Sequence, residues 1–127
     1  IHLNELFSDL PELDWETGEI YFGGPISNEV LAFMVETDTE PEQALSIANH
    51  IYLALDPDLL RTFLVHPERR RQLRVYSGYA GWAPGQLEAE IERGDWWVVP
   101  LQKRHLFPET PDQLWEQLVR QLRGKWV

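Results

Sequence analysis

The chain has 127 residues, of which 43% are hydrophobic, and its formal net charge is −10. This length is typical of one domain with a buried core, and no apolar run reaches the ~18–20 residues of a transmembrane helix. The absence of cysteine excludes disulfides, thiol nucleophiles and thiolate metal sites. We therefore expect a cytoplasmic protein with no membrane contact.

Charge is unevenly distributed along the chain. The first 60 residues hold 13 acidic side chains and no Lys or Arg, whereas the remaining residues hold all 11 basic side chains and 8 acidic ones. An overall negative surface repels nucleic acid and anionic membranes. The only basic cluster is formed by Arg69, Arg70, Arg71 and Arg74.

The N-terminal part favours short strands. His2–Phe7 is typical of a strand end followed by a helical turn, and Leu10–Glu16 of a turn. Glu19–Phe22 predicts a short strand that the turn signal Gly23-Gly24-Pro25 ends. Val30–Val35 is a continuous apolar run of strand length, which predicts a strand buried on both faces.

The central part predicts a loop, a hairpin and a helix. Thr37–Glu42 is an acidic loop, and Leu45–Leu55 indicates a hairpin. Its turn falls at Asn49-His50, because Asn and His are among the residues that tolerate the left-handed region. Asp56 is then a suitable N-cap with Pro57 at the first helical position, and His66-Pro67 ends this helix.

The C-terminal part alternates strands and helices. Leu73–Ser77 predicts a strand, which a glycine-rich turn follows. Pro84–Arg93 predicts a helix with Gly94 as its stop signal. Trp96–Val99 is rich in aromatic and β-branched residues and predicts another strand.

The last helix has the clearest predicted start. Thr110 and Gln113 suggest a capping box around Pro111, and Gly124 ends the helix. The residues expected on its apolar face are Leu114, Trp115, Leu118, Val119 and Leu122. Interleaved strands and helices place the chain in a mixed α and β class.

Two glycine-rich blocks stand out in this pattern. They are Tyr21-Phe22-Gly23-Gly24-Pro25-Ile26 and Gly78-Tyr79-Ala80-Gly81-Trp82-Ala83-Pro84-Gly85-Gln86-Leu87-Glu88. In their residues, their order along the chain and their separation, the two blocks resemble the signature blocks of the AlgH/YqgE-type family. This family more often has valine in place of Ile26. Trp96-Trp97, His105-Leu106-Phe107 and the final helix with Trp115 also fit, so the resemblance covers nearly the whole chain.

The resemblance implies an α+β fold with a mixed, partly barrel-like β-sheet and flanking helices. It also implies a bacterial cytoplasmic protein described as a transcriptional regulator, with no settled catalytic activity and no fixed cofactor. That description refers to an effect on gene expression and does not establish DNA contact. Family members usually begin with a further block, so we expect residues 1–127 to form a single AlgH-like domain that corresponds to the C-terminal two-thirds of a longer protein.

The loop Gly78–Glu88 is the first candidate for a binding site. A helix that begins at Pro84 would leave the N–H groups of Gly85 and Gln86 available for an anion. The first glycine block joins this region through the resemblance alone. The predicted ligand-binding residues are Gly23, Gly24, Pro25, Gly78, Tyr79, Gly81, Trp82, Gly85 and Gln86.

The alternative interpretation of the same residues is tight packing of small glycines under large aromatic side chains. The carboxylates of Glu88, Glu90 and Glu92 on the predicted helix disfavour an anion. The loop also lacks the Lys-Ser/Thr ending of a P-loop. Both interpretations, packing and ligand binding, remain open at this point.

Catalytic and metal-binding patterns are weak. Ser77 lacks the glycines of a G-x-S-x-G nucleophile elbow. Glu88 and Glu92 share a helical face, but no third ligand lies at a useful local spacing. The sequence therefore predicts no catalytic residue, no metal and no cofactor.

Our leading hypothesis is a non-enzymatic regulatory or binding module that acts through an unknown protein partner or a small anionic ligand. The first alternative is a hydrolase of small phosphorylated or acylated substrates with an anion site at Gly78–Glu88. The second is nucleic-acid binding through Arg69–Arg74. We do not expect direct DNA binding, because no helix-turn-helix pattern is visible. We expect a monomer or a weak homodimer.

Overall fold

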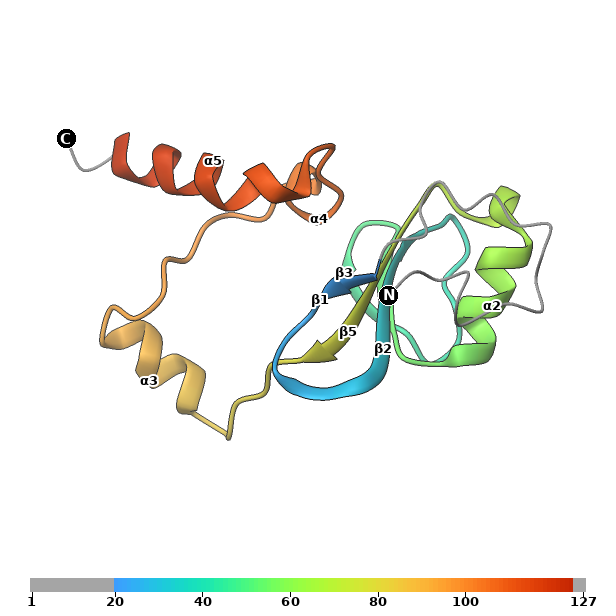
Figure 1. The fold of residues 1–127 in the computed structure, drawn as a ribbon, viewed down its shortest axis with the longest axis horizontal. Coiled ribbons are helices and arrows are strands. Elements are labelled where there is room, and N and C mark those ends of the chain that lie inside the picture. The colour runs from blue at the N-terminus through green and yellow to red at the C-terminus, as the bar shows by residue number, and fades with distance from the viewer. Residues whose placement is uncertain (1–19, 125–127) are drawn as a thin grey trace. The chain divides into compact units, whose positions relative to one another are not determined.

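The structure is a computed structural model, and it describes residues 20–124 (Figure 1). The chain divides after Ala83 into two compact units, and each unit is described by itself. The expectations for His2–Phe7 and Leu10–Glu16 lie outside the described residues.

Within residues 20–83, the first unit is built on a five-stranded sheet with the strand order β1-β5-β2-β4-β3. β1 pairs with β5 in parallel, and the other neighbours pair antiparallel. The sheet is therefore mixed, which confirms the predicted α+β class. Within the described residues it is open rather than closed into a barrel, with β1 and β3 at its edges. The strands are Ile20–Phe22 (β1), Ile26–Glu36 (β2), Leu45–Ala48 (β3), Ile51–Ala54 (β4) and Gln72–Tyr79 (β5).

The apolar run Val30–Val35 lies in β2 as predicted, but the strand is longer at both ends. Phe33 and Val35 point to one face, where they lie opposite Val75 and Leu73 of β5. Side chains alternate along a strand, and Met34 on the other face is also buried. The prediction of a strand buried on both faces is thus confirmed for the second half of β2.

The hairpin of β3 and β4 turns at Asn49-His50, as predicted. His50 has a φ of 62°, in the left-handed region that the turn requires. The acidic segment Thr37–Glu42 is likewise a loop, between β2 and β3.

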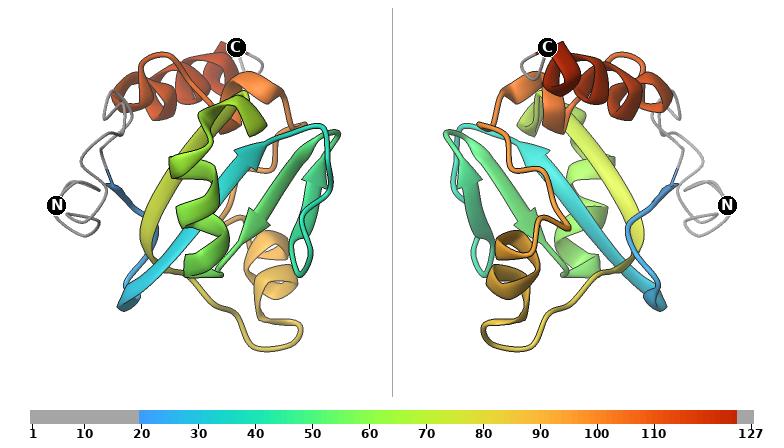
Figure 2. Two further views of the ribbon diagram at one scale, coloured as in Figure 1. Left: turned by 90° about the vertical axis from the view of Figure 1, so that its right-hand side faces the viewer. Right: turned by 90° about the vertical axis from the view of Figure 1, so that its left-hand side faces the viewer.

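One face of the sheet is covered by helix α2, Pro57–Val65 (Figure 2). The helix begins where predicted, since Asp56 Oδ1 accepts a hydrogen bond from Asp58 N at 3.0 Å. The short helix η2, Pro67–Arg69, follows it and leads into β5. The rings of Phe33 and Phe63 meet edge to face with their centroids 6.3 Å apart. The buried core of this unit contains Phe33, Val35, Tyr52, Ala54, Leu60, Phe63, Leu64, Leu73 and Val75.

The second unit contains the helices α3 (Gln86–Glu92), α4 (Lys103–Leu106) and α5 (Pro111–Gly124). The prediction that α3 begins at Pro84 is wrong by two residues. Gly85 occupies the N-cap with a φ of 80°, a conformation that glycine adopts without steric cost. Gly94 follows the helix with a φ of 84°, in agreement with its predicted role as a stop signal. None of the helices in residues 20–124 is long and apolar enough to cross a bilayer.

The predicted strand Trp96–Val99 is also wrong, because this segment forms neither strand nor helix. High β-propensity reflects how well a side chain fits a paired strand, and pairing needs a partner. Among the described residues no strand pairs with this segment.

Helix α5 begins and ends where predicted, but its capping differs. Gln113 N donates to the backbone O of Thr110 at 3.0 Å, whereas the Thr110 hydroxyl lies 3.5 Å from Gln113 Oε1. A reciprocal capping box is present at α4 instead, where Gln102 N donates to His105 Nδ1 at 3.2 Å. Gln and His are not among the preferred cap residues, so this box has no recognisable sequence signature.

Candidate functional site

The two glycine blocks meet in the first unit. Gly23 N donates to the backbone O of Ser77 at 2.8 Å, and Ile26 pairs with Tyr79 across β2 and β5. These contacts arise because β5 lies between β1 and β2 in the sheet. We call residues 22–26 together with residues 78–82 the glycine junction. The predicted proximity of Gly23 and Gly24 to Gly78 and Tyr79 is therefore observed.

Close backbone contact explains two of these glycines. A Cβ atom on Gly23 would lie 2.5 Å from the carbonyl oxygen of Gly78. A Cβ atom on Gly24, which has a φ of 152°, would overlap the backbone of Tyr79 and Ala80. Glycine is the residue that permits such an approach. At these two positions the packing interpretation accounts for the sequence.

Strand β5 extends further into the second block than predicted. Gly78 and Tyr79 belong to the strand rather than to a turn, because Tyr79 pairs with Ile26. Gly78 has a φ of 76° and is buried, so this position also requires glycine.

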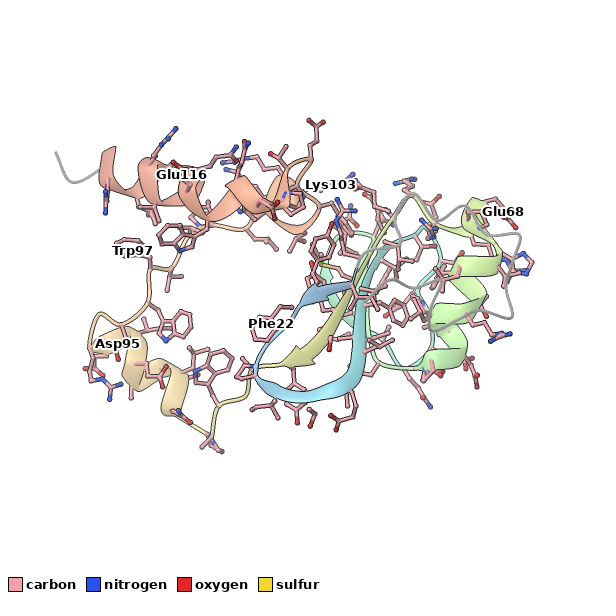
Figure 3. The ribbon with its side chains drawn as sticks, viewed as in Figure 1. Phe22, Glu68, Asp95, Trp97, Lys103 and Glu116 are labelled. Carbon is pink, nitrogen blue, oxygen red and sulfur yellow. The ribbon has the colours of Figure 1, made fainter. Side chains whose placement is uncertain are left out.

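Several large apolar side chains of the glycine junction face solvent. Phe22 is 76% exposed and projects outward from the end of β1 (Figure 3). Ile26, Tyr79 and Trp82 are each at least 40% exposed. Gly81 lies beside Ile26 and Tyr79, since a Cβ atom on it would be 3.5 Å from Ile26 Cδ1 and 3.9 Å from Tyr79 Cε2. A group of exposed apolar side chains of this kind marks a candidate interaction surface.

Gly85 and Gln86 lie beyond the division of the chain, in the second unit. No atom lies within 4 Å of a Cβ built on Gly85. Gln86 Nε2 donates to Glu90 Oε1 at 3.0 Å, and Glu90 Oε2 accepts from Trp96 Nε1 at 2.7 Å. The Gln86 side chain therefore holds the first turn of α3 to Glu90, and through it to Trp96.

The basic cluster is tied to its own unit. Thr37 is buried, and its hydroxyl donates a hydrogen bond to the carbonyl oxygen of Arg69. This bond fixes the backbone of the segment that connects α2 to β5. Each of the four residues of the cluster therefore contacts another part of the first unit. Their contacts are Arg69 O with Thr37 Oγ1 (2.6 Å), Arg70 Nε with Phe63 O (3.0 Å), Arg71 Nη2 with Asp38 Oδ1 (2.5 Å) and Arg74 Cζ with the centre of the Tyr21 ring (5.9 Å).

Among the described residues of this unit, two titratable groups have shifted pKa values. Burial raises the pKa of Tyr76, and the neighbouring Tyr21, 6.0 Å away between ring centres, adds to this, whereas Arg74 opposes it. The pKa of Glu68 is lowered, first by a hydrogen bond from its own backbone and then by the side chain of His66 at 3.1 Å. Neither group lies in the glycine junction.

Metal-binding geometry is absent from residues 20–124, in which no group of three or more His, Asp or Glu side chains could hold an ion. Ser77 lies within β5, and its carbonyl group accepts the hydrogen bond from Gly23.

A groove of about 500 Å³ lies in the second unit, between α5 and the segment that follows α3. Its walls are mostly apolar, and three tryptophans contribute to them. We call it the tryptophan groove; its lining residues are Gly94, Asp95, Trp96, Trp97, Val99, Trp115, Leu118, Val119 and Leu122. The sequence analysis missed it because Trp96–Val99 was assigned to a sheet. The apolar face predicted for α5 was the signal that could have found it.

Comparison with known proteins gives a consistent result. A family profile described as AlgH-like matches residues 1–127. A UPF0301 protein of Chlamydia abortus is 31% identical over 105 residues, which are 83% of this chain and 55% of that protein. A UPF0301 protein of Methylococcus capsulatus is 32% identical over 102 residues, with 80% and 56% covered. The chain thus spans about half the length of these curated relatives.

Solved structures show the same fold. The solution structure of the AlgH protein from Pseudomonas aeruginosa matches with a TM-score of 0.74 at 22% identity, over 96% of this chain and 66% of that one. A crystal structure of a Corynebacterium diphtheriae protein matches with a TM-score of 0.61 at 23% identity, over 82% and 56%. At these identities the likeness concerns the fold alone.

Proposed function

Because the chain belongs to the AlgH-like family, we propose that it is a cytoplasmic, non-enzymatic regulatory module that acts by binding a protein partner at the glycine junction. A role in transcription would then follow from this partner rather than from direct contact with DNA. The longer relatives carry further residues, so the proposal concerns this part of the chain.

The observation that carries the proposal is the set of exposed apolar side chains at the junction. Phe22, Ile26, Tyr79 and Trp82 face solvent on a backbone that close glycine contacts hold in place. Aromatic side chains on a rigid support are typical of the anchors that supply most of the binding energy in interfaces.

A small anionic ligand is the weaker form of this proposal. The anion site was predicted at the N–H groups of Gly85 and Gln86. The helix α3 begins at Gln86, however, and the side chain of Gln86 is bonded to Glu90. The net charge of −10 also opposes an anion. Apolar contact with a protein therefore fits the junction better.

The two other hypotheses have less support. The hydrolase alternative placed its anion site at Gly78–Glu88, but Gly78 and Tyr79 belong to β5 and the Gln86 side chain is bonded to Glu90. Nucleic-acid binding relied on Arg69–Arg74, whose contacts with Asp38, Phe63 and Tyr21 draw these side chains towards their own unit.

The test is a comparison of Phe22→Ser with the control Leu55→Ser. Both residues are exposed apolar side chains of the first unit, but Leu55 directly follows β4 and lies outside the junction. Proteins that the wild-type chain captures by crosslinking in its host are identified, purified and titrated by isothermal calorimetry. We expect Phe22→Ser to weaken binding about tenfold or more and Leu55→Ser to leave it unchanged.

Equal affinity of wild type and Phe22→Ser for the partner would contradict the proposal that the partner binds at the glycine junction. In parallel, amide chemical shifts are followed during titration with inorganic phosphate and with nucleotides. Saturable chemical-shift changes confined to residues 22–26 and 78–82 would show that the junction binds a small ligand rather than a protein partner.

A further inference from the structure

Ser27 has an unusual backbone conformation for a residue inside a strand. It lies within β2 with a φ of 50°, in the left-handed region. The other described non-glycine residues with a positive φ, Gln43 and His50, lie in turns. A Cβ atom makes the left-handed region costly, and residues held there concentrate at functional positions. Ser27 directly follows Ile26 of the glycine junction, so its conformation bears on that site.

A β-bulge between β2 and β5 contains Ser27. Leu31 lies opposite Ser77 and Ile26 lies opposite Tyr79, so the two pairs are five residues apart in β2 but only two apart in β5. Three extra residues of β2 are therefore accommodated between the two pairs. A residue in the left-handed region is one of the ways in which a strand forms a bulge, and bulges change the direction of the side chains beside them.

The bulge decides which side chain faces Tyr79. In an uninterrupted antiparallel ladder the strands advance together, so extension of the pairing beyond Leu31 would place Glu29 opposite Tyr79. The observed register places Ile26 there instead. Ile26 also lies beside Gly81, since a Cβ atom on Gly81 would be 3.5 Å from Ile26 Cδ1. The register thus selects an apolar side chain over a carboxylate at this point.

We infer that Ser27 is the positioning residue of the glycine junction, because its left-handed backbone sets the register of β2 against β5. Through this register Ile26, rather than Glu29, lies opposite Tyr79. Ser27 therefore acts on the junction through the side chain of its neighbour in the sequence.

The two segments that form the junction are free of charge. Residues 20–28 and 75–87 carry no charged side chain. The carboxylate of Glu29 beside Tyr79 would be the exception, and it would have to lose its water when an apolar partner surface binds, which is unfavourable. Ser27 thus keeps the junction apolar. This consequence for binding rests on the proposed function, whereas the register of β2 and β5 does not.

The test compares Ser27→Val and Ser27→Gly with wild type in the whole chain. Valine is β-branched and is strongly disfavoured in the left-handed region, whereas glycine adopts it without steric cost. Cross-strand backbone NOEs, measured by NMR, report the register. We expect NOEs between Ile26 and Tyr79 in wild type and in Ser27→Gly. In Ser27→Val we expect them to be lost, with NOEs between Glu29 and Tyr79 in their place.

A serine in an ordinary strand conformation provides the matched control. Ser46 lies in β3 and is not among the described residues with a positive φ. Glycine weakens a regular strand, so Ser46→Gly should lower the urea midpoint of unfolding, whereas Ser27→Gly should not. Conversely, Ser27→Val should lower the midpoint and Ser46→Val should not. The glycine pair decides the question even if Ser27→Val fails to fold.

Two results would overturn the inference. One is a Ser27→Val chain that keeps the NOEs between Ile26 and Tyr79 together with the wild-type midpoint. The other is a Ser27→Gly chain that loses as much stability as Ser46→Gly.

The protein partner captured by crosslinking distinguishes this inference from the proposed function. We expect it to bind Ser27→Gly as tightly as wild type and Ser27→Val about tenfold more weakly. Unchanged affinity for Ser27→Val after the NOEs between Ile26 and Tyr79 are lost would contradict the proposed function. The loss of these NOEs would still support the role of Ser27 in setting the register.

Discussion

Gly24 lies so close to the peptide that joins Tyr79 to Ala80 that its α-carbon has no space for a side chain. This contact joins the end of the first glycine block to the end of β5, and Gly23 makes a hydrogen bond to β5 next to it. The backbone of the junction is therefore fixed by main-chain contacts, while the larger side chains around it are left at the surface.

Replacing Gly24 with alanine should destabilise the first unit strongly. The new methyl group would overlap the backbone of Tyr79, and alanine would also have to adopt a φ of 152°. We expect a loss of about 3 kcal/mol in the free energy of unfolding, measured by urea denaturation. Gly81→Ala is the control, because its Cβ would meet only Ile26 and Tyr79 at ordinary contact distances. Similar stability of the two variants would refute the packing role of Gly24.

The buried hydroxyl of Thr37 should contribute to the stability of the arginine-rich connector. Thr37→Val keeps the shape of the side chain but removes the hydrogen bond to the carbonyl oxygen of Arg69. We expect the free energy of unfolding to fall by about 1–2 kcal/mol. Thr39→Val, at an exposed position of the same loop, should change it by less than about 0.5 kcal/mol. Chemical denaturation of both variants provides the measurement, and an equal effect would show that the hydrogen bond contributes little.

The stability that the N-cap of α2 contributes should depend on the acceptor oxygen of the Asp56 side chain. Asp56→Ala removes the acceptor for Asp58 N, and we expect a loss of about 1 kcal/mol. Asp56→Asn retains an oxygen at the same place and should stay close to wild type. Thermal unfolding followed by circular dichroism distinguishes the two variants. If Asp56→Asn lost as much stability as Asp56→Ala, the charge rather than the capping bond would be responsible.

Local signals account for most of the elements that the sequence predicted. The turn at Asn49-His50 and the start of α2 at Asp56 depend on the conformational preferences of single residues, and both are observed. Trp96–Val99 shows the limit of this approach, because β-propensity describes a paired strand and nothing within the segment supplies the partner. The start of α3 was misplaced since Gly85 in a left-handed conformation, rather than Pro84, sets it.

The candidate site depended on information that local patterns do not contain. That Gly23 and Gly24 lie against Gly78 and Tyr79 follows from β5 being placed between β1 and β2, a long-range arrangement. Only the family resemblance suggested it. The exposure of Phe22 was not foreseen either, because the alternation of a three-residue strand does not show which face is covered.

The ionisation of Tyr76 should make the protein less stable at alkaline pH. Burial raises the pKa of Tyr76, with a further increase from Tyr21 and a partial offset from Arg74, whereas a tyrosine in the unfolded chain ionises near pH 10. Above that pH the unfolded state loses a proton that the native state retains, so stability falls as pH rises. The contribution of Tyr76 is complete below about pH 10 and is lost as the pH passes through its raised pKa.

Tyr76→Phe removes this ionisable group and keeps the ring, so its free energy of unfolding should fall less steeply than that of wild type between about pH 9 and 11. Urea denaturation at a series of pH values gives the two slopes, and the absorbance of tyrosinate near 295 nm follows the ionisation directly. The control is the comparison at pH 7, where both chains carry a neutral ring and only a small difference is expected. Parallel slopes for the two chains would show that Tyr76 ionises equally easily in the folded and unfolded states. This result would contradict the prediction that burial beside Tyr21 raises the pKa of Tyr76.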